Sequence, residues 1–253
     1  MRDELDDEFF VGYLPTPPRT KRFAIGAAVF ALVLALGVAA LGVVGSGSTG
    51  VGFGAQGATP AGGVVGVLST HPYGVLWVPS ERGPEAVLLV SQGKFGIGDR
   101  YDALDGTVVS VSGYQLEREG RRMIELGGAP TPATLPEAQL ATLRTRAEAP
   151  GGEVRITGEI VDEKCWLGRM RPGAARTHRA CAQLCIAGGI PPVLVGTDAQ
   201  GTSYAALVVG PDGAAIGDAL LPYVAEPVAV TGELVRDGDL DYLRVAPGGI
   251  ERL

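Results

Sequence analysis

Residues 111–118 read VSGYQLER and residues 230–236 read VTGELVR, so one strand-like element with a central glycine occurs twice. Two further pairs of segments keep the same offset in residue number: LLV at 88–90 with LVV at 207–209, and IGD at 97–99 with IGD at 216–218. Three matches at one spacing indicate an internal duplication. We therefore expect two copies of one fold unit.

Each copy contains short runs rich in Val, Ile and Leu that end at Gly, Pro or Asp, which is the pattern of strands joined by tight turns. The first copy predicts strands at residues 64–69, 75–78, 86–91, 107–116 and 122–126 with a helical turn at 98–104, and the second repeats them between 154 and 245. Five strands with a helical turn after the third follow the order of an OB-like barrel, in which Gly113 and Gly232 permit a bend in the fourth strand. A generic β-sandwich is the alternative.

These patterns predict a mainly β chain with two tandem OB-like five-stranded barrels, at residues 64–128 and 153–253. Residues 129–152 separate them and are rich in Pro, Ala and Gly at their ends. Within this separator, residues 136–146 favour a short helix, with Leu135, Leu140 and Leu143 on one face.

The second copy carries an insertion between its first two strands, at residues 162–192, which read DEKCWLGRMRPGAARTHRACAQLCIAGGIPP. It contains all three cysteines of the chain and one of its two histidines. Residues 174–187 favour a helix that ends at Gly188-Gly189, and on it His178, Cys181 and Cys185 share one face. Cys165 would approach from the preceding loop.

Three interpretations of this Cys/His set stay open. Cys165, His178, Cys181 and Cys185 form a Cys3His donor set, which suits zinc and, less well, an iron–sulfur centre. A disulfide from Cys165 to either helical cysteine suits an oxidising compartment, and a reactive thiol is the third interpretation. The absence of C-x-x-C-H argues against attached haem, and a content of only three methionines argues against copper.

Basic residues concentrate in the insertion of this otherwise acidic chain. They are Lys164, Arg169, Arg171, Arg176 and Arg179. One interpretation is a solvated helix face with Asp162 and Glu163 as counter-ions. The other is a set of cations that favours thiolates and attracts an anionic ligand or an acidic partner.

Residues 23–44 contain no charged side chain, and a helix of this length spans a hydrocarbon core of roughly 30 Å. Arg19, Lys21 and Arg22 precede it, and the next charged residue is Glu81. The positive-inside rule therefore predicts a single-pass protein of the cell inner membrane, with a cytoplasmic N-terminus and periplasmic C-terminal domains. A cleaved signal peptide is the alternative.

The segments on either side of this helix have compositions unlike a folded domain. Residues 1–22 combine acidic, aromatic and proline residues and are expected to form a cytoplasmic tail, whereas residues 45–63 are mainly Gly, Ser, Ala and Thr and are expected to form a flexible linker. The formal net charge of −7 argues against a nucleic-acid partner.

The pattern D-x-x-C…H-x-x-C-x-x-x-C…GG, followed by V-x-V-T-G at 228–232, resembles a loosely defined group of small exported bacterial domains. The group is OB-like and mostly uncharacterised, and the resemblance covers the second copy alone. It implies a fold and a Cys/His cluster and no reaction. The tethered-barrel organisation is also similar to that of the periplasmic haem chaperone of cytochrome c maturation, whose C-terminal haem-binding histidine motif this sequence lacks.

No Ser/His/Asp arrangement is evident in the sequence, which favours a non-enzymatic role. We expect an accessory or binding module of a membrane protein assembly, with a Cys3His metal or disulfide site. Its partner would be an integral membrane or periplasmic protein. The alternative is an electron-transfer or thiol-redox component of a periplasmic respiratory-type system.

Overall fold

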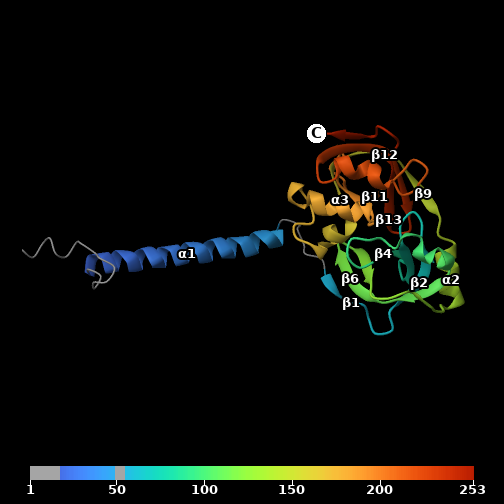
Figure 1. Ribbon diagram of the computed structural model, residues 1–253, viewed down its shortest axis with the longest axis horizontal. Helices are drawn as coiled ribbons and strands as arrows, with labels where there is room; N and C mark the ends of the chain where they lie inside the picture. The colour runs from blue at the N-terminus through green and yellow to red at the C-terminus, as the bar shows by residue number, and fades with distance from the viewer. Residues whose placement is uncertain (1–17, 49–54) are drawn as a thin grey trace, which may run out of the picture. The chain divides into compact units, whose positions relative to one another are not determined.

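The structure, a computed structural model, describes residues 18–48 and 55–253 (Figure 1). The chain divides into two compact units, Met1–Gly52 and Phe53–Leu253. Most of the expected cytoplasmic tail lies outside the described residues.

The first unit contains a single described helix, α1 (Pro18–Ser48). Proline suits its first position, because the first amide of a helix has no partner within the helix. The window Thr20–Val38 has a mean hydropathy of 1.9, and none of it is buried. The apolar helix expected over 23–44 is confirmed, and it is long and apolar enough to cross a membrane, a property that a signal sequence shares.

The second unit is built on two sheets. The first has the order β1-β6-β7-β4-β3-β2-β5-β8, with β1 (Ala55–Ala58), β2 (Val64–Ser69), β3 (Val75–Ser80), β4 (Gly83–Val90), β5 (Val108–Val111), β6 (Gly113–Arg118), β7 (Arg121–Leu126) and β8 (Thr131–Pro132). The second has the order β13-β11-β10-β9-β12-β14, with β9 (Glu148–Asp162), β10 (Pro192–Thr197), β11 (Ser203–Val209), β12 (Pro227–Asp237), β13 (Leu240–Arg244) and β14 (Ile250–Arg252). A mainly β fold is therefore confirmed.

The two sheets connect their strands in the same way. In each, three successive strands pair antiparallel, a 3-10 helix follows, and the last strand of a hairpin then pairs parallel with the third strand. The 3-10 helices are η1 (Gly98–Leu104) and η4 (Gly217–Tyr223). The registers match too, because Leu88 faces Met123 in the first sheet and Leu207 faces Tyr242 in the second.

The glycines expected to permit a bend in the fourth strands lie where each strand comes close to its neighbour. A Cβ atom on Gly113 would overlap the carbonyl oxygen of Glu125, and a Cβ on Gly232 would lie 2.5 Å from the carbonyl oxygen of Arg244. Each glycine therefore allows a close approach to the neighbouring strand. The register shift in β12 falls later, between Leu234 and Val235.

The folded part begins earlier than the sequence indicates. Residues 45–63 were expected to form a linker, but α1 extends to Ser48. Strand β1 also lies in this segment and pairs with β6, from Ala55 opposite Glu117 to Ala58 opposite Tyr114. In the sequence between β8 and β9, the expected short helix is present as α2 (Glu137–Arg144), in which Leu143 is buried.

The two sheets share one hydrophobic core in addition to their own. This shared core contains Trp77, Leu88 and Met123 from the first sheet, Leu207 and Tyr242 from the second, and Cys165, Trp166 and Cys185 from the insertion. The buried Tyr73 hydroxyl donates to the carbonyl oxygen of Val208 at 2.7 Å, which adds a polar contact between the halves. The insertion is thus built into the contact between the two sheets, with α3 (Arg179–Ala187) beside both (Figure 1).

Candidate metal centre

The insertion folds as two short turns followed by α3. A π-helical turn (Cys165–Arg169) begins almost directly after β9, and a 3-10 turn (Arg176–His178) leads into α3. A Cβ atom on Gly173 would overlap the carbonyl oxygen of Cys165, so a glycine lets the returning loop lie against that residue. The helix ends at Gly188 as expected.

The four donors expected from the sequence come together on α3 and the two turns before it. The ligand atoms of Cys165, His178 and Cys181 lie within 4.8 Å of one another, and those of Asp162, Cys165 and Cys185 do the same. Cys165 belongs to both groups. The four predicted residues therefore lie close enough to hold one metal ion, and their donor set is compatible with zinc.

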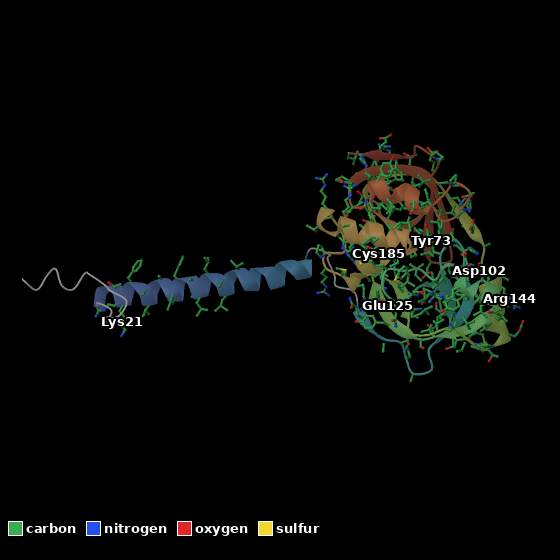
Figure 2. The ribbon with its side chains drawn as sticks, in the orientation of Figure 1. Lys21, Tyr73, Asp102, Glu125, Arg144 and Cys185 are labelled. Carbon is green, nitrogen blue, oxygen red and sulfur yellow. The ribbon has the colours of Figure 1, made fainter. Side chains whose placement is uncertain are left out.

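The thiols of this cluster are free. All three cysteines lie in the described part of the chain, and none of them forms a disulfide. Cys165 and Cys185 are buried, whereas Cys181 is only partly buried. Figure 2 shows Cys185 where α3 faces the first sheet.

Asp162, at the end of β9, holds the histidine and the first cysteine in place. One carboxylate oxygen accepts the backbone N–H of Cys165 at 2.9 Å, and the other lies 3.0 Å from Nε2 of His178. Asp162 is fully buried. A carboxylate bound to one imidazole nitrogen orients the other toward a metal, which is the usual partner arrangement of a metal-binding histidine.

Lys94 reaches the cluster from the first sheet. Its Nζ lies 2.7 Å from Sγ of Cys181 and 3.8 Å from Sγ of Cys185. The loop that carries Lys94 is fixed by the buried Lys164, whose Nζ donates to the carbonyl oxygens of Ser91 and Gly93 at 3.2 and 2.7 Å. Nothing in the local sequence around Lys94 indicates this contact.

The protonation of the thiols is uneven. A hydrogen bond to Cys185, burial and the nearby Asp162 carboxylate raise the pKa of the Cys165 thiol. The same hydrogen bond lowers the pKa of Cys185, and the Lys94 ammonium lowers it further. The hydrogen bond to Cys181 in turn raises the pKa of Lys94. Without metal, Cys165 therefore donates its proton toward the sulfur of Cys185, and binding of a metal to Cys165 must release that proton.

Met170 is a second neighbour that the sequence reasoning did not single out. Its Sδ lies 3.5 Å from Sγ of Cys181, and the residue is 47% exposed. As the one methionine in the insertion, it could have been recognised from its proximity to Cys165 in the sequence.

The interpretation of the basic residues as a solvated helix face, with Asp162 and Glu163 as counter-ions, is wrong for Lys164, and both counter-ions lie in the interior. Asp162, Glu163 and Lys164 are buried. Glu163 pairs with Arg121 at 2.7 Å and Lys164 with Glu125 at 2.7 Å, so both attach the insertion to the first sheet. A buried charge needs such a partner because removal from water is costly.

The remaining basic residues are nearer the surface. Arg169 lies 3.3 Å from the carboxylate of Glu125, and Arg176 and Arg179 both pair with Glu226. Each of these two carboxylates thus faces more than one cation.

A scan against protein-family models, a search of curated proteins and a search of solved structures each found no match to this chain.

We expect Asp162→Asn to lower zinc affinity by about 10–100-fold, the usual effect of losing the partner that orients a metal-bound histidine. Asparagine keeps the size of the side chain and removes the charge that fixes the His178 ring. Competition with a chromophoric chelator measures the change. The matched control is Asp212→Asn, in an exposed turn after β11. Equal zinc affinities in the two variants would contradict the role of Asp162.

Proposed function

We propose that this chain is a membrane-anchored extracytoplasmic accessory module that binds one zinc ion through Cys165, His178, Cys181 and Cys185. The observation that carries the proposal is the convergence of these donors from the two short turns and α3, with all the thiols free. Three thiolates and one imidazole fill the four positions of tetrahedral zinc, which leaves none for a substrate. This supports a structural or binding centre rather than an enzyme.

The position of the centre supports a role in holding the insertion and the two halves together. Cys165 and Cys185 belong to the hydrophobic core that both sheets share, and Lys94 approaches from the first sheet. A metal at this point would link the end of β9 to α3. Because the unfolded chain offers no such site, the binding free energy would add to the stability of the fold.

We also propose that the two sheets are duplicated OB-like units. The strand order supports this, because β12 pairs with β9 and with β13, while β13 pairs parallel with β11. The first sheet follows the same order, with β5 and β6 together in the place of β12. The insertion occupies the loop between the first two strands of the second unit, which is one of the loops through which OB folds bind their ligands.

The proposed location rests on α1 and its flanking charges. Lys21 and Arg22 lie at the start of the apolar window, and the sequence carries no charge between residues 23 and 80. This asymmetry supports a cytoplasmic N-terminus and a periplasmic β unit in the inner membrane, next to an integral membrane or periplasmic partner.

A topology reporter tests this location. We expect a reporter that is active only outside the cytoplasm to work when fused after Leu253, because the basic residues retain the N-terminal side in the cytoplasm. A reporter that is active only in the cytoplasm is the matched control and should be inactive at the same site. The opposite pattern would refute the proposed orientation.

Elemental analysis of the full chain, purified in detergent without added metal, tests the centre. We expect one zinc ion per chain and three thiols that resist alkylation until a strong chelator removes the metal. Protection follows because a thiolate bound to zinc is a poorer nucleophile than a free thiolate. A metal-free protein with a Cys165 disulfide would refute the zinc proposal.

The partial exposure of Cys181 beside Lys94 favours a second candidate, a thiol-redox or electron-transfer component. Exposed thiols next to a cation are the reactive ones. A thiol that is alkylated rapidly in the native protein, or a visible absorbance band from an iron–sulfur centre, would favour this candidate over zinc.

A further inference from the structure

We propose that Met170 is a further donor of this centre and that the centre also takes monovalent copper, which enters and leaves through Cys181 and Met170. This inference rests on the proposed metal centre and names an ion and an exchange path that a closed zinc site does not need. It concerns a residue outside the Cys3His set.

The first observation is the position of the Met170 thioether. Its Sδ lies 3.5 Å from Sγ of Cys181, so a metal bound to Cys181 has a thioether within reach of a small rotation of the Met170 side chain. The other described methionine, Met123, is fully buried in the shared core and has the ordinary role of an apolar side chain.

The second observation is the chemical character of the donors. With Met170 the cluster offers four sulfur atoms, from Cys165, Cys181, Cys185 and Met170. Thiolates suit monovalent copper and zinc alike, but a thioether is a soft ligand that suits monovalent copper and is not among the usual zinc ligands, which are thiolate, imidazole and carboxylate. The low number of methionines argued against copper from the sequence. In the structure the cysteines supply most of the soft donors, and one methionine suffices.

The third observation is a gradient of exposure across the cluster. Cys165 and Cys185 are buried, Cys181 is partly buried, and Met170 is 47% exposed. The two donors at the open side, Cys181 and Met170, are in contact with each other. An ion that arrives from solvent or from a donor protein meets Met170 and Cys181 before it reaches the buried thiols.

The charge around the open side also suits a monovalent ion. Three thiolates leave a more negative centre around a monovalent ion than around zinc. The Lys94 ammonium, 2.7 Å from Sγ of Cys181, offsets part of that charge at short range.

The test compares two Met→Leu variants of the full chain in detergent, under anaerobic conditions. Affinities for monovalent copper and for zinc are measured separately, each by competition with a chromophoric chelator. We expect Met170→Leu to weaken copper binding about tenfold or more while zinc affinity stays within about twofold, because leucine keeps the volume and removes the soft donor. Met123→Leu, the matched control, should leave both affinities unchanged.

Each other outcome is decisive. Unchanged copper affinity in Met170→Leu, or an equal fall for copper and zinc, overturns the role of Met170. A wild-type protein that binds zinc and not copper overturns this inference and leaves the zinc proposal intact. A wild-type protein that binds neither metal overturns both.

Discussion

The His178→Ala variant is expected to lose the zinc-dependent part of the stability of the protein. His178 supplies the one nitrogen donor of the proposed centre, and it is buried against Asp162. Loss of a direct ligand should reduce zinc affinity by more than the about 100-fold that loss of an outer partner costs. At a free zinc concentration about 1,000 times the dissociation constant, binding adds about 4 kcal/mol to the wild-type stability. Most of that contribution should vanish in the variant.

The measurement is the difference in melting temperature between zinc-loaded and chelator-treated protein. In the chelator-treated samples, the fall in melting temperature reports the loss of a buried side chain. The difference between zinc-loaded and chelator-treated protein reports the contribution of the metal alone. His71→Ala is the matched control, because His71 is the other histidine of the chain and its side chain is largely exposed. We expect His71→Ala to keep the full zinc-dependent difference.

The same comparison separates a metal centre from a disulfide. A disulfide between Cys165 and a helical cysteine needs nothing from His178. A His178→Ala protein with an unchanged zinc-dependent difference would therefore contradict the zinc centre, and an intact Cys165 disulfide in that protein would identify the alternative.

Local patterns predicted the parts of this molecule that depend on neighbours in the sequence. Runs of Val and Leu between turn residues marked the longer strands of both sheets, because alternation and chain reversal are encoded within a few residues. They did not mark the short strands β1, β8 and β14. Helical spacing also brought His178, Cys181 and Cys185 to one face, and the structure keeps that arrangement on α3 and the turn before it.

The parts of the site that the sequence did not predict depend on contacts between the two copies. Lys94 lies in the loop after β4 of the first sheet and reaches Cys181 because the sheets pack on each other. No periodicity in one copy encodes how it packs on the other. The duplication predicted that the two copies connect their strands alike, but the shared core depends on Tyr73, Trp77 and Trp166, whose partners lie far away in the sequence.

The burial of Glu163 and Lys164 was missed for a related reason. Charged residues are almost never fully buried unless they are paired, so a run of DEK after a strand predicts exposure. Here the partners Arg121 and Glu125 lie on β7 of the first sheet, and the pairing becomes visible only when both sheets are in place.

Among the polar contacts, disruption of the Arg121–Glu163 pair is expected to lower the free energy of unfolding most. Arg121 Nε donates to the Glu163 carboxylate at 2.7 Å, and its Nη1 donates to the carbonyl oxygen of Ala205 at 2.9 Å. The Glu163 side chain is fully buried. Arg121→Met leaves that carboxylate buried without its partner, which should lower the free energy of unfolding by about 3–5 kcal/mol.

Denaturant unfolding of the full chain in detergent, with zinc in excess throughout, measures this loss. Arg236→Met is the matched control, because Arg236 pairs with Asp241 while its own side chain is 62% exposed, and we expect it to cost less than about 1 kcal/mol. The double variant Arg121→Met, Glu163→Met removes both buried charges and should recover most of the loss, since replacing a whole buried pair by apolar residues is often nearly neutral. If the double variant lost as much free energy of unfolding as the two single variants together, the loss would come from packing and not from the buried carboxylate.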